Sequence, residues 1–280
     1  MTSLPALPRV LHLTDLHLQA DPTATLKGVR TLDALEQLLD EARRELPDPA
    51  RVVITGDIAH DERAETYEHL RRALGDWVDI CRIVPGNHDN RDALAAVLPE
   101  AVQRGQAGRV VFSERVGAWH LIGLDTHVPG REWGRIGEAQ LAWLERELGS
   151  APTVLFLHHP PLKVGTPWLE FVGLRESDAL LALARGCACL RAIFHGHAHQ
   201  ELEGRLERGA QTGPDAVPVF GTPATCFQFK KGALLPRIDT ELAPGYRVLE
   251  LSDELHTQVR RLSTVAHGKN WPGAASLAGR

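Results

Sequence analysis

The fold is decided by residues 80–89, which read Ile-Cys-Arg-Ile-Val-Pro-Gly-Asn-His-Asp. The apolar run that opens this stretch predicts a buried strand, and the Pro-Gly pair ends that strand in a turn. In the turn, Asn87 offers a neutral oxygen to a cation, His88 can exchange a proton near neutral pH, and Asp89 can orient that imidazole. The same residue types also make ordinary polar turns. The role of this stretch therefore depends on the side chains at the ends of the other predicted strands.

Four other apolar runs end in side chains that commonly bind metals. These are Asp15 and His17 after residues 9–14, Asp57 after residues 52–54, His158 after residues 153–157, and His197 and His199 after residues 191–194. In extended backbone, the side chains of residues two apart point the same way, so Asp15 and His17 can bind one ion together. The same spacing recurs in His197 and His199. Counted with Asn87, the chain offers seven candidate ligands.

Seven ligands suffice for two adjacent metal ions if one carboxylate bridges them. Asp57 is the natural bridge, because it is the lone charged group of its loop. A centre with two ions ~3.5–4 Å apart can clamp the attacking and leaving oxygens of a phosphoryl displacement. Each motif alone has an ordinary explanation, such as a solvated turn or a helix cap. Their combination at five strand ends favours a metal centre.

The order of the predicted elements indicates an α/β fold. Apolar residues at helical spacing cover residues 27–46, and a second helix over about 61–74 has Asp61 as its predicted N-cap. Alternating strands and helices build a sheet whose ligands gather at the carboxyl ends of its strands. Four later runs suit a second, more antiparallel sheet; they cover residues 202–206, 217–220, 246–251 and 257–262.

Composition narrows the classes of function. With 280 residues, 43% of them hydrophobic, the chain can bury a large core in one domain or in a domain with an appendage. The formal net charge of −5 gives no basic face for nucleic acid and favours a small substrate. No apolar run approaches the ~20 residues that span a bilayer. The four cysteines lack zinc-finger spacing and no charged-then-apolar leader precedes Arg9, so we expect reduced thiols and a cytoplasmic location.

The five motifs occur in the order seen in calcineurin-like metallophosphoesterases, and the sequence resembles that family. They are Asp15-x-His17, Gly56-Asp57, Gly86-Asn87-His88-Asp89, His158 and Gly196-His197-x-His199. Within the family, the chain looks most similar to the bacterial class III 3′,5′-cyclic AMP phosphodiesterases. That narrower likeness rests on residues 13–17, 158–161, 221–230 and 243–246.

The resemblance implies a four-layer α/β/β/α sandwich, in which two mixed β-sheets are flanked by helices. It implies a single metallophosphoesterase domain over residues 1–264, in which residues 200–246 include a cap or loops on the substrate side. Residues 265–280 are rich in Gly and Ala and are expected to form a flexible C-terminal tail.

The resemblance also assigns the ligands to two ions. One ion is held by Asp15, His17, Asp57 and His199, and the other by Asp57, Asn87, His158 and His197. The family favours iron paired with manganese, and the nitrogen and oxygen donors also suit zinc or cobalt. His88 is implied to contact the phosphate and to protonate the departing 3′-oxygen, with Asp89 behind it as orienter.

The implied activity is hydrolysis of 3′,5′-cyclic AMP to 5′-AMP through a metal-activated hydroxide, since bound metals lower the pKa of water towards ~7. The partner is then a small cyclic nucleotide, without nucleic acid or membrane. A second hypothesis keeps the metals but assigns another phosphodiester or a monoester, such as a 2′,3′-cyclic nucleotide or a glycerophosphodiester. A third is a metal-dependent scaffold that has lost catalysis. The oligomeric state stays open, although relatives are often homodimers.

Three histidines near the motifs have simpler explanations. His12 lies within the first strand and is expected in the core as a hydrogen-bonded side chain. His159 would point away from the ligand before it in extended backbone, either towards solvent or behind the metal shell. His195 precedes Gly196 and is expected to be structural.

Overall fold

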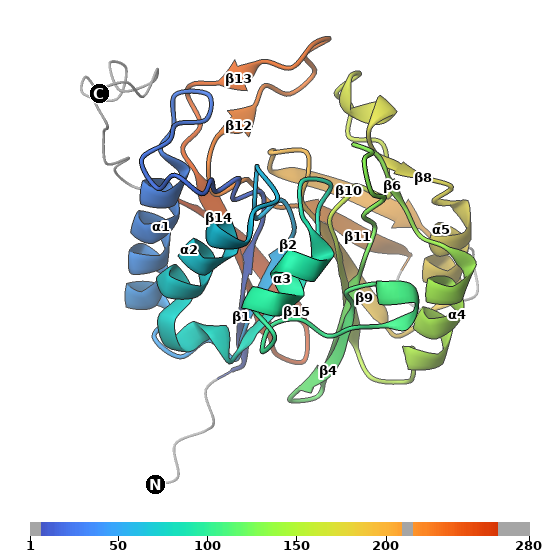
Figure 1. The fold of residues 1–280 in the computed structure, drawn as a ribbon. Helices are drawn as coiled ribbons and strands as arrows, with labels where there is room; N and C mark the ends of the chain where they lie inside the picture. Colours follow the sequence, from blue (N-terminus) through green and yellow to red (C-terminus); the bar gives the residue numbers. More distant parts are fainter. Residues whose placement is uncertain (1–6, 209–214, 263–280) are drawn as a thin grey trace, which may run out of the picture.

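The computed structural model describes residues 7–208 and 215–262. Two β-sheets pack face to face and helices cover the outer face of each, which is the four-layer order that the resemblance implies (Figure 1). The tail expected over residues 265–280 lies outside the described part of the chain. Among the residues described, no helix has the length and apolar character needed to cross a membrane.

The first sheet has five strands in the order β15-β14-β1-β2-β3. Their bounds are β1 Arg9–Leu13, β2 Arg51–Thr55, β3 Cys81–Val84, β14 Gly245–Leu251 and β15 Leu255–Arg261. β1, β2 and β3 are parallel, and the crossovers between them run through α1 (Thr31–Glu45) and α2 (Ala64–Leu74). Parallel neighbours need such long connections, which explains the alternation of strands and helices in the sequence. α3 (Arg91–Val97) follows β3 and packs against α2.

The second sheet has six strands in the order β10-β11-β9-β7-β5-β4. Their bounds are β4 Phe112–Val116, β5 Trp119–Leu124, β7 Thr153–Leu157, β9 Leu190–His195, β10 Leu202–Glu207 and β11 Ala216–Gly221. The four inner strands are parallel and the two edge strands antiparallel. α4 (Glu138–Glu147) and α5 (Asp178–Gly186) lie on the outer face.

Shorter elements complete the described residues. They are the paired strands β6 Gly134–Arg135 and β8 Leu174–Arg175, the paired strands β12 Gln228–Phe229 and β13 Ile238–Asp239, and the 3-10 helices Gly75–Val78, Gln106–Gly108 and Leu169–Phe171.

The four C-terminal β runs do not share one sheet, so that expectation is wrong. β10 and β11 join the second sheet, whereas β14 and β15 return to the first, where Arg9 of β1 lies opposite Glu250 of β14. Alternating apolar residues mark a strand but do not say which open edge it will pair with. The predicted N-cap of α2 is also wrong, because the helix begins at Ala64, and the Asp61 carboxylate accepts hydrogen bonds from the Thr66 hydroxyl and the Ala20 amide.

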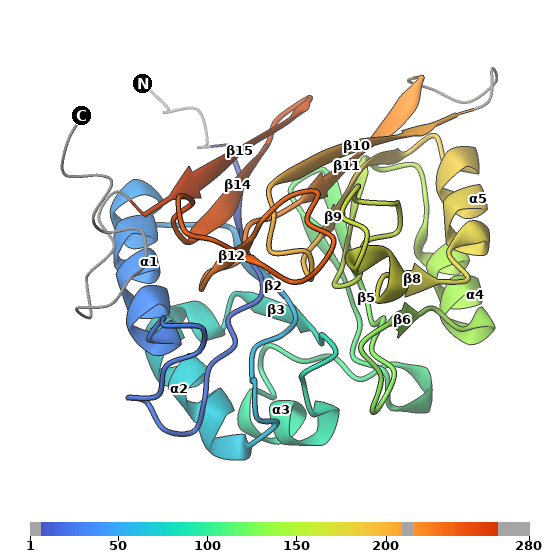
Figure 2. The same cartoon turned by 90° about the horizontal axis from the view of Figure 1, so that it is seen from above.

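Three packed clusters of side chains hold the layers together. Alternate residues of a strand point to opposite faces, so Val10 packs between the sheets while Leu11 and Leu13 pack under the helices. The inter-sheet cluster includes Phe156 and Phe194, whose rings stack 5.4 Å apart. The loops that follow β1, β2, β3, β7 and β9 meet on one side of this core (Figure 2).

Candidate metal centre

Five of the seven predicted ligands have a left-handed backbone. Their φ angles are 54° for Asp15, 47° for His17, 50° for Asp57, 64° for His197 and 49° for His199. The extended backbone expected for Asp15 and His17 is therefore wrong, although their side chains converge as expected. Such a backbone costs about 1–3 kcal/mol per residue and is typical of functional sites.

Hydrogen bonds between neighbouring loops hold this backbone in place. The amides of Asp15 and His17 donate to the carbonyls of Gly56 and Asp57, at 3.0 and 2.8 Å. A Cβ atom on Gly86 would lie 2.4 Å from the Asp57 amide nitrogen, so only glycine lets the loop after β3 approach the loop after β2 this closely. The approach also lets the His88 amide donate to Asp57 Oδ1 at 3.0 Å.

The first ligand group comprises Asp15, His17, Asp57 and His199, all buried. The Nε2 atoms of His17 and His199 lie 3.0 Å apart. His199 Nε2 is 3.4 Å from Asp15 Oδ1, and His17 Nε2 is 3.6 Å from Asp57 Oδ2. These four side chains therefore point at one volume.

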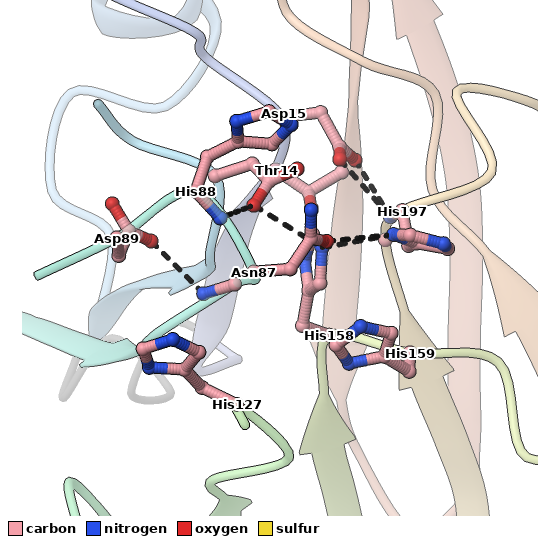
Figure 3. Close-up of polar contacts among 12 residues, drawn as sticks. Thr14, Asp15, Asn87, His88, Asp89, His127, His158, His159 and His197 are labelled. Atoms are coloured by element: carbon pink, nitrogen blue, oxygen red, sulfur yellow. Dashed lines mark hydrogen bonds and ion pairs between the residues drawn. The ribbon is translucent and has the colours of Figure 1, made fainter. Parts of the chain in front are cut away.

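The second group comprises Asp57, Asn87, His158 and His197, and Figure 3 labels the last three. His158 Nε2 lies 3.4 Å from Asp57 Oδ1 and 3.2 Å from Asn87 Oδ1. His197 turns its Nδ1 to the same point, 3.0 Å from Asn87 Oδ1. Asp57 thus presents one oxygen to each group, which is the arrangement of a bridging carboxylate.

The donor atoms fit two metal ions. Ligand bonds of about 2.0–2.2 Å at tetrahedral or octahedral angles place neighbouring donors ~3.0–3.6 Å apart, which matches the separations in both groups. His158 and His199 direct their Nδ1 atoms to the carbonyls of Thr55 and Phe227, at 2.7 and 2.8 Å. A carbonyl only accepts, so Nδ1 carries the proton and Nε2 faces the site, as in histidine metal sites.

Burial and charge set the protonation of these groups without a metal. Burial lowers the pKa of His17 and His197 well below the usual value and that of His199 to about 4, so these imidazoles are neutral at pH 7. Burial would also lower the pKa of His158, but the Asp57 carboxylate raises it to about 9. A metal bound by His158 would compete with this proton.

The two carboxylates of the site also differ from each other in pKa. Burial raises the pKa of Asp15 to about 7. Burial acts in the same direction on Asp57, but the nearby His158 outweighs it and holds the pKa of Asp57 well below its usual value. Asp57 is therefore charged at neutral pH, as a bridging ligand must be.

His88 stands outside both ligand groups, on the wall of a cavity of about 260 Å³. Its half-buried ring lies 5.1 Å from the ring of His17 and stacks at 4.9 Å on the ring of His60. Trp168 and Phe229 line the same cavity, and their rings meet edge to face at 4.9 Å. Sequence reasoning missed His60, whose signal was a titratable residue three positions after Asp57 on the same loop.

Asp89 does not contact the His88 ring in the way expected. Its carboxylate accepts hydrogen bonds from the amides of Ile58, Ala59 and Gly86, at 2.9–3.3 Å, and from the Tyr67 hydroxyl at 3.2 Å. Figure 3 shows the His88 ring turned away from this carboxylate. Burial raises the pKa of Asp89 to about 6. Asp89 therefore ties the loop after β2 to the loop after β3.

The neighbouring histidines are structural, as expected. His12 lies in the core between the hydroxyls of Thr55 and Thr222, at 2.9 and 2.8 Å. His159 is buried behind the ligands, where its nitrogens meet the Thr126 hydroxyl at 2.7 Å and the Glu132 carbonyl at 3.0 Å. His195 is buried, with Nδ1 3.0 Å from the Gly196 carbonyl.

Comparison with known proteins assigns this centre to a family. Residues 8–201 match the family described as calcineurin-like phosphoesterase. The chain belongs to the calcineurin-like phosphoesterases. It is a hydrolase of a family that uses a dinuclear metal centre, and the His and Asp clusters of this chain fit such a centre.

Similar sequences extend over nearly the whole of this phosphoesterase. It is 35% identical over 260 residues to the 3′,5′-cyclic adenosine monophosphate phosphodiesterase CpdA of Escherichia coli (strain K12), covering 91% of this chain and 90% of that protein. It is 33% identical over 263 residues to CpdA of Pseudomonas aeruginosa, with the same coverage. A probable cyclic nucleotide phosphodiesterase of Synechococcus is 32% identical, covering 88% of each chain.

Solved structures show the same fold at low sequence identity. A dimetal phosphatase from Danio rerio superposes with a TM-score of 0.62 at 14% identity, covering 91% of this phosphoesterase and 96% of that chain. A purple acid phosphatase from yellow lupin seeds superposes with a TM-score of 0.63 at 12% identity, covering 93% and 52%. These likenesses confirm the predicted fold.

Proposed function

We propose that this phosphoesterase hydrolyses 3′,5′-cyclic AMP to 5′-AMP. The observation that carries the proposal is an aromatic-walled cavity that opens directly on the ligand groups, in a chain 35% identical to a cyclic AMP phosphodiesterase. Trp168 and Phe229 offer flat apolar surface for a base, and His17, Asp57 and Asn87 line the same cavity, where the phosphate would bind. The cavity is small, which favours a mononucleotide over a polymer.

The chemistry divides between the metals and the chain. When bound, two divalent ions acidify water and neutralise charge on the phosphoryl oxygens. Asp57 and Asn87, which line the cavity, would help to hold the ions beside the bound phosphate. His88 is placed at the cavity wall to give a proton to the departing 3′-oxygen. Asp89 acts through the loops that it ties together, as a positioning residue.

For the metals we propose iron with manganese, on the family resemblance. The donors in both groups are nitrogen and oxygen, and the buried Cys226 thiol does not compete, because its Sγ donates to the Asp15 carbonyl at 3.1 Å. Zinc or cobalt would suit the same donors. Metal analysis of protein purified without added metal identifies the resident ions.

A substrate panel tests the proposed function. We expect the highest kcat/KM for cyclic AMP when it is compared with cyclic GMP, 2′,3′-cyclic AMP and a glycerophosphodiester. A preference of more than about tenfold, or 1.4 kcal/mol, for any of the others would overturn the substrate assignment. Metal-replete Asn87→Ala and His88→Ala test the site itself, and unchanged turnover in both would place catalysis elsewhere.

Three further expectations accompany this function. The four cysteines are free thiols, which supports the proposed cytoplasmic location. We also expect a single domain over residues 1–264 with a substrate-side cap within 200–246. Phe227 and Phe229, which lie in the cavity wall, support the cap. Association into a homodimer stays a prediction that sedimentation measurements would test.

A further inference from the structure

Three of the four ligand histidines turn Nε2 to the site, and their outer Nδ1 atoms are held in two different ways. His158 and His199 each direct Nδ1 to a backbone carbonyl. His17 differs, because its Nδ1 lies 3.3 Å from Nδ1 of another imidazole, that of His60. A carbonyl can only accept, whereas an imidazole nitrogen either donates or accepts according to its tautomer. The tautomer of the His17 ring is therefore linked to the tautomer of the His60 ring.

The ligand geometry decides which nitrogen donates. His17 turns Nε2 towards Asp57 and His199, so a metal bound there leaves the His17 proton on Nδ1. His60 Nδ1 must then accept that proton's hydrogen bond, and the single proton of a neutral His60 resides on Nε2. His60 is thus a hydrogen-bond donor towards its surroundings and not a base.

The backbone and ring of His60 are both fixed. Its amide donates to the Leu18 carbonyl at 2.8 Å, which ties it to the loop that carries His17. Its half-buried ring stacks on the ring of His88 with an interplanar angle of 27° and forms part of the cavity wall. One side chain therefore touches both a metal ligand and the proposed proton donor.

We propose that His60 is a positioning residue that holds the His17 proton on Nδ1 and supports the ring of His88. The inference rests on the proposed function in one respect, that His17 binds a metal through Nε2. It assigns to His60 no contact with the metal. The two roles are separable by chemistry, since one needs an acceptor atom and the other needs a flat ring.

Three substitutions separate these roles. His60→Asn keeps an acceptor close to the position of Nδ1 but lacks the ring. His60→Phe keeps a ring to stack on His88 but has no acceptor, and His60→Ala lacks both. His256→Asn on the exposed face of β15 is the matched control. Thermal melts of the metal-free proteins identify any variant that fails to fold.

The first readout is metal retention, measured by chelator competition with zinc-loaded protein. Loss of a partner on a ligand histidine costs about 10–100-fold in metal affinity. We expect that loss for one of the two ions in His60→Phe and His60→Ala, and retention in His60→Asn and His256→Asn. The second readout is nitrogen NMR of the His17 ring, which is expected to show the proton on Nδ1 in zinc-loaded wild type and in His60→Asn.

The third readout is turnover of cyclic AMP. We expect His60→Phe, once saturated with metal, to keep a higher kcat than His60→Asn, because it keeps the ring against His88. Equal metal affinity in all variants, a His17 proton on Nε2, or a third zinc ion shared with His60 would each overturn the inference. The metal and NMR readouts need no substrate, so they stand if cyclic AMP proves to be the wrong substrate. Wild type that binds no metal would instead overturn the proposed function.

Discussion

Gly196 provides a direct test of how tightly the two sheets meet at the metal centre. A Cβ atom added there would lie 1.9 Å from Thr14 Oγ1 and 2.8 Å from Asp15 Oδ2. The Thr14 hydroxyl donates to the Thr55 carbonyl at 3.0 Å, and Asp15 accepts from the His197 amide at 3.0 Å. Gly196→Ala must therefore displace a hydroxyl that is already hydrogen-bonded, or move a predicted ligand.

The expected cost follows from these contacts. Overpacking a core costs about 1–3 kcal/mol, and a lost hydrogen bond about 0.5–1.5 kcal/mol. The smaller entropy of the unfolded alanine chain returns about 0.4–1 kcal/mol. We therefore expect Gly196→Ala to lower the free energy of unfolding of the metal-free protein by about 2–3 kcal/mol. It should also weaken binding of the ion held by Asp15.

Urea denaturation and metal analysis provide the measurements. Gly186→Ala is the matched control, because a Cβ atom on this last residue of α5 meets nothing within 4 Å. Thr14→Ala removes the clashing oxygen, so the double variant should lose at least about 1 kcal/mol less than the sum of the single losses. If Gly196→Ala behaves like Gly186→Ala, or if Thr14→Ala brings no relief, the steric explanation is refuted.

Three further predictions concern stability. Asp89→Asn places an amide nitrogen against the backbone amides of Ala59 and Gly86 and should lower the free energy of unfolding by about 1–3 kcal/mol in urea denaturation. Tyr67→Phe removes one hydrogen-bond donor to the Asp89 carboxylate and should cost less. Asp125→Ala should lower the free energy of unfolding by about 3–5 kcal/mol, because it leaves the Arg91 guanidinium without its partner. The Asp125 carboxylate is fully buried and pairs with this guanidinium at 2.7 and 2.8 Å. Glu176→Ala breaks the exposed ion pair with Arg135 and should cost less than about 1 kcal/mol. Metal restored to chelator-treated protein at a concentration of 100 times Kd should raise the free energy of unfolding by about 2.7 kcal/mol, measured by a thermal melt. A chelator should remove the metal more easily at low pH, where protons compete with the metal for His158.

The sequence allowed the fold class and the strands that carry the candidate ligands to be predicted, because each candidate ligand follows a short apolar run within five residues. The backbone of those ligands could not be predicted in the same way. Left-handed φ at Asp15 and Asp57 is imposed by hydrogen bonds between loops far apart in sequence, which periodicity does not report. His60 was missed because it stands alone, without the repeated spacing that identified His197 and His199.

The pairing of β14 with β1 has a consequence for how the chain is made. Arg9 lies opposite Glu250, so one edge of β1 stays open until residue 250 has emerged. At 5–20 residues per second, that delay is roughly 10–50 s. β1 pairs with β2 along its other edge, so over this interval the nascent chain carries an apolar strand that is paired on one side only, and the candidate metal centre is completed only after the strands of the second sheet have emerged. Exposed strand edges of this kind pair with other strands, so β1 carries a risk of aggregation that lasts until β14 covers its open edge.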